Sequence, residues 1–393
     1  MEKGLTQYQK KFRELFGDLS GTIAVRSPGR VNLIGEHTDY YEGFVLPAAV
    51  DKVILFIIAP ANGTRCRLYA ADLNDTFEFD TTAFERSPKG WPNYLMGVVD
   101  QLQKNGFIVG GFDCLFGGNI PIGAGMSSSA AIEGGLIYAL NRIFDFGIDR
   151  LTLVKLAQRA ENLFVGVNCG IMDQYINIFG EAKKVVKIDC RSLDYEYFPF
   201  ERTDLRIVLC DTTVRRALAT SEYNIRRKQC EEGVGILQAA YPSIRSLRDA
   251  DLSMLADHER KFDPVVYRRC RYVVEENIRV SRACEDLQKN DFSSFGRRMF
   301  ASHAGLSAQY EVSCRELDIL VDIASGIEGV YGARMMGAGF GGCTINLVQA
   351  DAVEKFSAVV RTKYTQQTGI EPKIHISSIQ ARTGTLVEKP QYV

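Results

Sequence analysis

The glycine- and serine-rich stretch PIGAGMSSSAAIEGG, from Pro121 to Gly135, is the part of the sequence best suited to binding an anion. Gly123 and Gly125 have no Cβ and can turn the backbone so that successive N–H groups point inward. Ser127, Ser128 and Ser129 follow, where a helix is expected to begin. Because a helix N-terminus carries unpaired N–H groups and about half a positive charge, this arrangement suits phosphate. On this stretch alone, a capped helix that binds nothing is an equally good interpretation.

A second group of polar residues lies nearer the N-terminus, between apolar segments. Arg30, Glu36, His37 and Asp39 fall within ten residues of one another, beside a Pro-Gly turn. Any one of them is typical of an ordinary turn, in which Asp39 would bond its own backbone and His37 would be exposed. The four together favour a ligand site.

Two acidic residues further along the chain need a partner or a role. Asp173 stands beside Ile171 and Met172, and a carboxylate among apolar neighbours requires a partner. Capping of a helix explains Asp173 equally well. Glu161 lies near the end of a predicted helix over 152–164 and is expected to be exposed if nothing binds there.

Three further features have a plain structural interpretation. Trp91, the single tryptophan, is expected in the core, although an aromatic ring can also stack on a nucleotide base. Tyr223 with Arg226, Arg227 and Lys228 predicts a solvated helix face, with a phosphate or sugar contact as the alternative. The glycines of GARMMGAGFGG (332–342) precede a predicted strand over 343–348 and indicate either a close backbone approach or a hairpin loop.

The elements that must position these residues follow from the apolar periodicity. Strands are predicted at 23–25, 31–34 and 53–58, separated by Gly and Pro residues, and exposed antiparallel strands at 66–84. Further strands are predicted at 112–116, within 183–200 and at 205–213. Helices are predicted at 8–16, 130–144, 152–164, 265–287 and 292–306. A domain boundary near 200–204 divides the chain into 1–203 and 204–393, with no flexible linker between the two parts.

The composition argues against several classes of function. The 393 residues favour two domains, and 47 basic against 48 acidic residues give no field that would attract nucleic acid. The ten cysteines and four histidines show no zinc-ligand spacing, and scattered thiols are typical of a reduced cytoplasmic protein. No apolar run suits a secretory signal or a membrane span. We expect a cytoplasmic protein, a monomer, that acts on small molecules rather than on nucleic acid or a membrane.

The two commonest nucleotide-binding fingerprints are not met. No Walker lysine motif accompanies the loop at Gly123 to Ser129, and no acidic residue follows it at the spacing of a dinucleotide-binding fold. A phosphate loop here must therefore be of another type.

Taken together, these stretches resemble the GHMP family of small-molecule kinases and, within it, the galactokinases. GRVNLIGEHTDY (29–40) is similar to the galactokinase signature, PIGAGMSSSAA (121–131) to the phosphate motif of the family, and GARMMGAGFGG (332–342) to its third motif. GIMDQY (170–175), WPNY (91–94) and SEYNIRR (221–227) add galactokinase-like features. Three motifs in family order leave little room for chance.

The resemblance implies an α+β, two-lobed GHMP kinase fold with the active site in the cleft between the lobes. It implies Mg²⁺, with ATP as co-substrate, held by Ser129 and Glu161, and it reverses the expectation for Trp91, which would lie near the adenine. The implied catalytic residues are Arg30 and Asp173. The implied phosphate loop comprises Gly123, Ala124, Gly125, Met126, Ser127, Ser128 and Ser129. The implied sugar-binding residues are Glu36, His37, Asp39, Gly170, Asp173 and Tyr223.

The activity implied by the resemblance is ATP-dependent phosphorylation of D-galactose at C1, the first committed step of galactose utilisation by the Leloir pathway. Related kinases of N-acetylgalactosamine or arabinose, and a non-catalytic sensor of galactose and ATP, are the alternatives. Two places depart from the family pattern. Tyr41 stands where galactokinases usually have Asn, and Ser307, Ala308 and Gln309 replace a customary Arg-Asp-Asp run.

Overall fold

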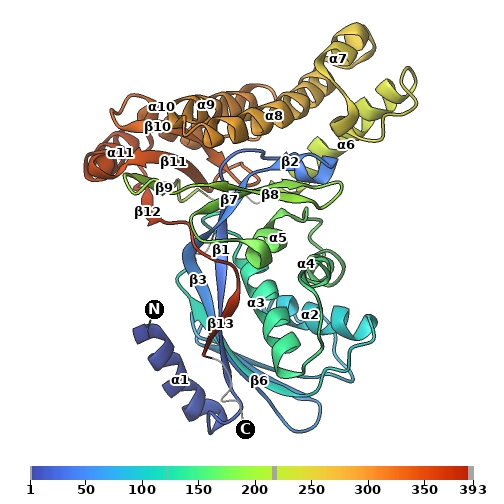
Figure 1. Cartoon of the computed structure of the whole chain (residues 1–393), viewed down its shortest axis with the longest axis vertical. Coiled ribbons are helices and arrows are strands. Elements are labelled where there is room, and N and C mark those ends of the chain that lie inside the picture. Colours follow the sequence, from blue (N-terminus) through green and yellow to red (C-terminus); the bar gives the residue numbers. More distant parts are fainter. Residues whose placement is uncertain (1, 122, 215–218, 388–393) are drawn as a thin grey trace.

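The computed structural model describes residues 2–121, 123–214 and 219–387, which form two lobes, each built on its own β-sheet (Figure 1). A six-stranded sheet lies in one lobe and a four-stranded sheet in the other, and a small three-stranded sheet lies close to their junction. Among the described helices, none combines the length and the apolar composition that crossing a bilayer requires.

The first lobe is a six-stranded sheet with helices on both faces. Helix α1 (Glu2–Phe16) packs on one face through Phe12, and helices α2 (Pro92–Lys104) and α3 (Ser128–Ile143) cover the other. Across the sheet the strand order is β13-β1-β3-β6-β4-β5. The strands are β1 (Ile23–Asn32), β3 (Pro47–Pro60), β4 (Arg65–Ala70), β5 (Asp75–Asp80), β6 (Phe112–Gly118) and β13 (Gly384–Val387).

Strand β1 corrects one prediction. The separate strands expected at 23–25 and 31–34 are largely one element, and the Ser-Pro-Gly segment lies inside it. Proline is tolerated there because the register against β3 shifts between Pro28 and Arg30, and because β13 pairs only with Ala24 to Arg26. The continuous strand brings Arg30 to the end of the sheet that faces the second lobe.

Two helical segments that follow α4 (Arg150–Arg159) in the first lobe carry acidic residues, Glu161 in η2 (Ala160–Val165) and Asp173 in α5 (Met172–Phe179). Helix α4 continues directly into the π-helical segment η2, and a loop then leads into α5. Beside them lies the small antiparallel sheet of β2 (Phe44–Val45), β7 (Lys184–Asp189) and β8 (Tyr195–Pro199). Wide π turns are rare and concentrate at functional sites.

The second lobe contains the antiparallel sheet β10-β11-β9-β12. Its strands are β9 (Leu205–Asp211), β10 (Val330–Met336), β11 (Cys343–Gln349) and β12 (Lys373–Ser377). Alternate residues of β9 face opposite ways: Ile207 packs with α8 and α9, and Val208 packs with α10 and α11. Those helices are α8 (Pro264–Gln288), α9 (Phe292–Ala308), α10 (Arg315–Ser325) and α11 (Val353–Thr368), and α6 (Ala219–Gln238) and α7 (Leu252–His258) extend the lobe at one end.

The predicted elements are largely confirmed, with one further correction. The helices expected at 8–16, 130–144, 265–287 and 292–306 correspond to α1, α3, α8 and α9. Gly332 does not belong to the glycine loop, because it lies within β10, and only 337–342 connect β10 to β11 as a hairpin. Division of the chain at 203/204 stays a prediction, and β13 returns from the C-terminal part to pair with β1.

Candidate active site

The polar turn after β1 is fixed by the second lobe. The backbone N–H of Gly35 donates to Glu276 Oε1 over 2.9 Å, and the Tyr272 hydroxyl donates to the carbonyl of Glu36 over 3.0 Å. Gly35 has φ +93°, and a Cβ there would lie 2.7 Å from the carbonyl oxygen of Phe44. Only glycine fits this crowded left-handed position. Helix α8, which is distant in the sequence, therefore fixes the backbone of the turn at Gly35 and Glu36.

Glu36 is held by a buried arginine. The Arg334 side chain is fully buried and donates to the carbonyls of Asn32 and Leu33 and, over 3.1 Å, to Glu36 Oε1. The backbone N–H of Gly337 donates to the same oxygen over 2.8 Å. A buried charge pair with additional hydrogen bonds has a well-defined geometry. The glycine-rich loop at 337–342 thus contacts the turn after β1 through a hydrogen bond to Glu36.

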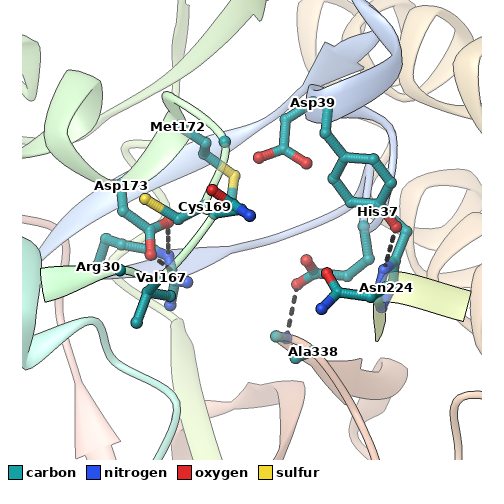
Figure 2. A pocket seen from close by; sticks show the side chains of 15 residues that line it. Arg30, His37, Asp39, Val167, Cys169, Met172, Asp173, Asn224 and Ala338 are labelled. Atoms are coloured by element: carbon teal, nitrogen blue, oxygen red, sulfur yellow. Dashed lines mark hydrogen bonds and ion pairs between the residues drawn. The ribbon is translucent and has the colours of Figure 1, made fainter. Parts of the chain in front are cut away.

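A cavity of about 270 Å³ opens between these elements. In Figure 2, Arg30 and Asp173 lie on one side of it, His37 and Asn224 lie on the other, and Asp39 projects from a third direction. The structure therefore brings six predicted site residues to one cavity. The cavity is lined by the predicted Arg30, Glu36, His37, Asp39, Gly170 and Asp173 together with Tyr40, Gly166, Val167, Asn168, Cys169, Met172, Asn224, Gly337 and Ala338.

Arg30 and Asp173 form a bidentate ion pair at the edge of the cavity (Figure 2). Nε of Arg30 lies 2.8 Å from Asp173 Oδ1 and Nη2 lies 2.9 Å from Oδ2. Burial alone would lower the pKa of Arg30, but the charges of Asp173 and Glu36 raise it above its ordinary value. Asp173 lies in the first turn of α5 without being its N-cap, so the capping interpretation is wrong.

The predicted phosphate loop reaches this ion pair directly. Helix α3 begins at Ser128, as expected, but the Ser127 side chain does not cap it. Ser127 has φ +54°, and its hydroxyl donates to Asp173 Oδ2 instead. Arg30 donates through Nη1 to the carbonyl of Gly125, and its backbone N–H donates to Met126. The loop and the cavity therefore share one ion pair.

The remaining loop residues occupy the turn before α3. Gly123 and Gly125 have φ of +75° and +69°, which glycine adopts without strain. Ala124 is buried beneath the turn, and Ser128 and Ser129 are partly exposed in the first turn of α3. These residues do not line the cavity. They adjoin it through Ser127.

Glu161 was expected to be exposed if nothing binds there, and the structure buries it. The π-helical segment η2 turns it inward to 6% exposure, toward Glu133 of α3. Burial and the charges of neighbouring carboxylates raise the pKa of Glu161, and raise that of Glu133 well above its ordinary value. Hydrogen bonding to Ser129 opposes this rise at Glu161. Glu133 carried no local signal in the sequence, because its partners come from other helices.

Ser129 and Glu161 have the chemistry of a Mg²⁺ site. Mg²⁺ prefers hard oxygen donors and is usually held by one or two carboxylates together with water and phosphate. Burial and the charges of neighbouring carboxylates disfavour ionisation of Glu133 and Glu161, and a divalent cation beside Glu161 would offset that penalty. Within the described ranges, no group of three or more His, Cys, Asp or Glu side chains is arranged to hold a metal ion by itself.

Asp39, His37 and Gly170 make up the opposite wall of the cavity. Burial and the charges of Asp173 and Glu36 raise the pKa of Asp39 to about 7. Burial lowers the pKa of His37 to about 3, so its ring is neutral, and its Nδ1 lies 2.6 Å from the Tyr40 hydroxyl. A Cβ on Gly170 would lie 1.7 Å from Asp39 Oδ2. Glycine at 170 therefore leaves the space that the Asp39 carboxylate occupies.

Trp91 lies apart from the cavity lining. It is half-buried against Phe116 and Phe77, with ring centroids 5.7 and 6.2 Å away, and its Nε1 donates to Asp75 over 3.0 Å. The expectation of a packed Trp91 agrees with this position. Its proximity to an adenine stays a prediction.

The helix face at 223–228 needs a correction. The side chain of Tyr223 lies outside the described residues, although its backbone belongs to α6. Arg226 was predicted to be solvated but is buried, and it donates over 2.8 Å to each of the carbonyls of Tyr310 and Glu311 beyond the end of α9. A cation at a helix C-terminus satisfies carbonyls that have no partner in the helix.

Residues at both departures from the family pattern form hydrogen bonds with other parts of the chain. The Tyr41 ring is buried, and its hydroxyl donates to the carbonyl of Arg226, which joins the signature turn to α6. Ser307 donates to Asp318 over 3.1 Å, and Gln309 donates to Glu275 over 3.3 Å. These residues connect helices of the second lobe and do not line the cavity.

Asn224, Cys169, Val167 and Ala338 line the cavity but were not predicted as site residues. Ala338 follows Gly337 in the glycine motif, and Val167 and Cys169 lie in the loop before Asp173, so position beside a motif is the one signal they carried. Asn224 lies on α6 beside Tyr223. Neutral and apolar side chains acquire a role in a site only through their place in the fold.

Family models match three parts of the chain. The model described as "GHMP kinases N terminal domain" matches residues 93–181, "Galactokinase galactose-binding signature" matches 10–60, and "GHMP kinases C terminal" matches 283–366.

Individual relatives match nearly the full length. The chain is 41% identical to a galactokinase of Roseiflexus sp. (strain RS-1) over 98% of each chain. It is 42% identical to a galactokinase of Clostridium acetobutylicum, over 95% of this chain and 97% of that one. The crystal structure of Lactococcus lactis galactokinase complexed with galactose matches with a TM-score of 0.93 and 36% identity, over 98% of this chain and 100% of that one. Methanococcus jannaschii mevalonate kinase, at 18% identity over 91% of this chain and 98% of that one, shares the fold with a TM-score of 0.64. This chain therefore belongs to the galactokinases, within the GHMP kinase family.

Proposed function

We propose that this protein transfers the γ-phosphoryl group of ATP to the C1 hydroxyl of D-galactose, giving galactose 1-phosphate and ADP. The observation that carries the proposal is the shared ion pair: Arg30 and Asp173 border the cavity, and Ser127 of the phosphate loop contacts Asp173. A kinase must hold the acceptor hydroxyl and the phosphoryl group side by side, and positioning supplies much of the rate. The galactokinase relatives, one of them solved with galactose, support the choice of sugar.

Asp173 accepts the proton of the attacking hydroxyl in this proposal. Its carboxylate borders both the cavity and the phosphate loop, so a hydroxyl bound between them would lie within hydrogen-bond reach. The Ser127 hydroxyl and the two N–H donors of Arg30 fix the carboxylate in the plane that the ion pair defines.

Arg30 stabilises the transferring phosphoryl group. Its guanidinium is always charged and presents several donors in one plane, and one of them, Nη1, points to the loop at Gly125. Negative charge spread over the equatorial oxygens of a loose transition state is best offset by such a fixed cation.

Ser129 and Glu161 would hold Mg²⁺ with ATP. When bound, the metal ion neutralises charge on the ATP phosphates. The protein's own part is to offer one hydroxyl and one buried carboxylate beside a loop at a helix N-terminus. Gly123 to Ser129 cradle the phosphates, and Trp91 lies near the adenine.

The sugar hydroxyls are bound by Glu36, His37, Asp39 and Tyr223. Glu36 and Asp39 offer carboxylate oxygens, which are strong acceptors for hydroxyl groups, and neutral His37 adds a polar contact without charge. All ten cysteines are free thiols, which supports a cytoplasmic protein.

The testing experiment mixes purified protein with Mg-ATP and galactose, glucose, N-acetylgalactosamine, arabinose or mevalonate. ADP release gives the rate, and NMR identifies the phosphorylated carbon. Galactose 1-phosphate as the dominant product is the expected result. A different dominant sugar phosphate would overturn the substrate assignment. Binding of sugar and ATP without any turnover would favour the sensor, and the Asp173→Asn variant controls for ADP released by a contaminating enzyme.

A further inference from the structure

The carboxylates of Glu133 and Glu161 are joined by one amide, that of Gln174. Its Nε2 donates to Glu161 Oε2 over 2.7 Å and to Glu133 Oε2 over 3.0 Å, and the Gln174 side chain is fully buried. The two N–H groups of one NH₂ thus serve two different carboxylates. In this orientation the amide presents its NH₂ group, rather than its carbonyl oxygen, to both carboxyl groups.

Helix packing explains why the three side chains meet. Glu133 lies one turn after Ser129 on α3, so the two face the same way. Helices α3 and α5 approach closely at Gly134, where a Cβ would lie 2.1 Å from Asn177 Oδ1. Gln174 lies one turn before Asn177 on α5 and therefore faces α3 as well.

We propose that Gln174 is a positioning residue for the metal site: its amide fixes the Glu161 carboxylate toward Ser129 and links it to the helix that carries Asp173. This inference rests on the proposed function, in which Ser129 and Glu161 hold Mg²⁺ with ATP. Partners that orient a metal ligand typically change metal affinity 10–100-fold when they are removed.

Gln174 is an uncharged donor, and this matters beside the proposed metal site. A lysine or arginine at 174 would add a positive charge beside the proposed metal ligand Glu161. An amide donates hydrogen bonds to both carboxyl groups without adding such a charge.

The test compares Gln174→Met with Asn177→Leu. Both variants replace a buried amide on α5 with an apolar side chain of similar size, but Asn177 bonds only neutral groups, among them the Pro28 carbonyl at 2.7 Å. Mn²⁺ binding is measured by electron paramagnetic resonance with saturating ADP. We expect the Kd of Mn²⁺ to rise at least tenfold in Gln174→Met and to stay within twofold in Asn177→Leu, although both variants lower Tm.

Two outcomes would overturn the proposal: an unchanged Mn²⁺ Kd in Gln174→Met, or an equal rise in both variants, which would mark a general packing effect. If Gln174→Met does not fold, Gln174→Asn withdraws the amide by one methylene and is expected to weaken Mn²⁺ binding in the same direction. The measurement uses no sugar. A wild-type protein that does not phosphorylate galactose would therefore defeat the proposed function, while the Mn²⁺ comparison would still decide the role of Gln174.

Discussion

The proposed sugar side of the site, around Glu36 and Asp39, and its proposed metal side, around Glu133 and Glu161, compensate their buried carboxylates differently. On the sugar side, Glu36 receives hydrogen bonds from the fully buried Arg334 and from the backbone N–H of Gly337. On the metal side, Glu133 and Glu161 lie near each other, and the donor they share is the uncharged amide of Gln174.

As a result, the charge of Glu36 is compensated within the protein, whereas those of Glu133 and Glu161 are not. A carboxylate paired with a buried cation holds its position without a ligand. Carboxylates near one another repel, and burial penalises their charge, which is the cause of the raised pKa of Glu133 and Glu161. Removing Glu36 should therefore destabilise the protein, whereas removing Glu161 should stabilise the metal-free protein.

Asp173 stands where the two sides meet, and its replacement should have the largest effect. We expect Asp173→Asn to lower kcat roughly 10³-fold, the loss typical of a missing general base. Galactose should still bind, because Glu36 remains in place. Steady-state kinetics and calorimetry with galactose check this, with circular dichroism as the control for folding. Turnover near the wild-type rate would refute the role of Asp173 as base.

Substitution of Glu36 tests how much its pairing with Arg334 contributes to the stability of the protein. Glu36→Ala leaves the buried Arg334 cation without its carboxylate partner and should lower the free energy of unfolding by about 3 kcal/mol. Glu36→Gln keeps an acceptor oxygen of the same shape, so a smaller loss there would isolate the contribution of charge. Urea unfolding measures both. A stability equal to wild type in Glu36→Ala would show that Arg334 is satisfied by backbone carbonyls alone.

Asp39 gives the sugar side a pH dependence. Its pKa rises from 3.8 to about 7 on folding, so the folded state holds this proton more tightly than the unfolded state. The contribution of Asp39 to stability is present below pH 4 and is lost as the pH rises through 7. Asp39→Asn should therefore be more stable than wild type at pH 8 by about 1–2 kcal/mol, a value reduced for the open cavity, and equal at pH 4.

The stability difference between Asp39→Asn and wild type is measured by thermal unfolding of the sugar-free proteins from pH 4 to 8. The same Asp39→Asn variant should bind galactose more weakly at pH 8, since it lacks the carboxylate acceptor. A variant less stable than wild type at pH 8 would contradict the raised pKa of Asp39.

Glu161 gives the smallest expected change and the sharpest contrast with Glu36. Its pKa is raised on folding, so its contribution to stability is fully present below its ordinary value of 4.5 and is lost as the pH rises through the folded-state pKa. Glu161→Gln should slightly stabilise the metal-free protein at pH 8 and abolish the stabilisation that Mn²⁺ with ADP gives. Calorimetric scans with and without the metal distinguish the two effects. Destabilisation of the metal-free variant would mean that Glu161 is already compensated.

Much of the site could be predicted from local sequence, because the residues concerned stand close together in motifs. Arg30, Glu36, His37 and Asp39 lie within ten residues of one another, and Gly170 and Asp173 share GIMDQY, so each group reaches the cavity as a unit. The start of α3 at Ser128 followed from serine and glycine chemistry. Local conformational preference and motif spacing are properties of neighbouring residues, and the sequence contains them directly.

Burial and charge pairing were decided by the tertiary structure. Glu161 turned inward because a π-helical segment rotates it toward Glu133 on another helix. Arg226, expected in solvent, binds carbonyls beyond the end of α9, 84 and 85 residues away along the chain. The sequence by itself determined which side chains could bind phosphate, metal and sugar. Only the folded chain decided which of their charges are compensated, because that balance depends on partners brought together from distant parts of the sequence.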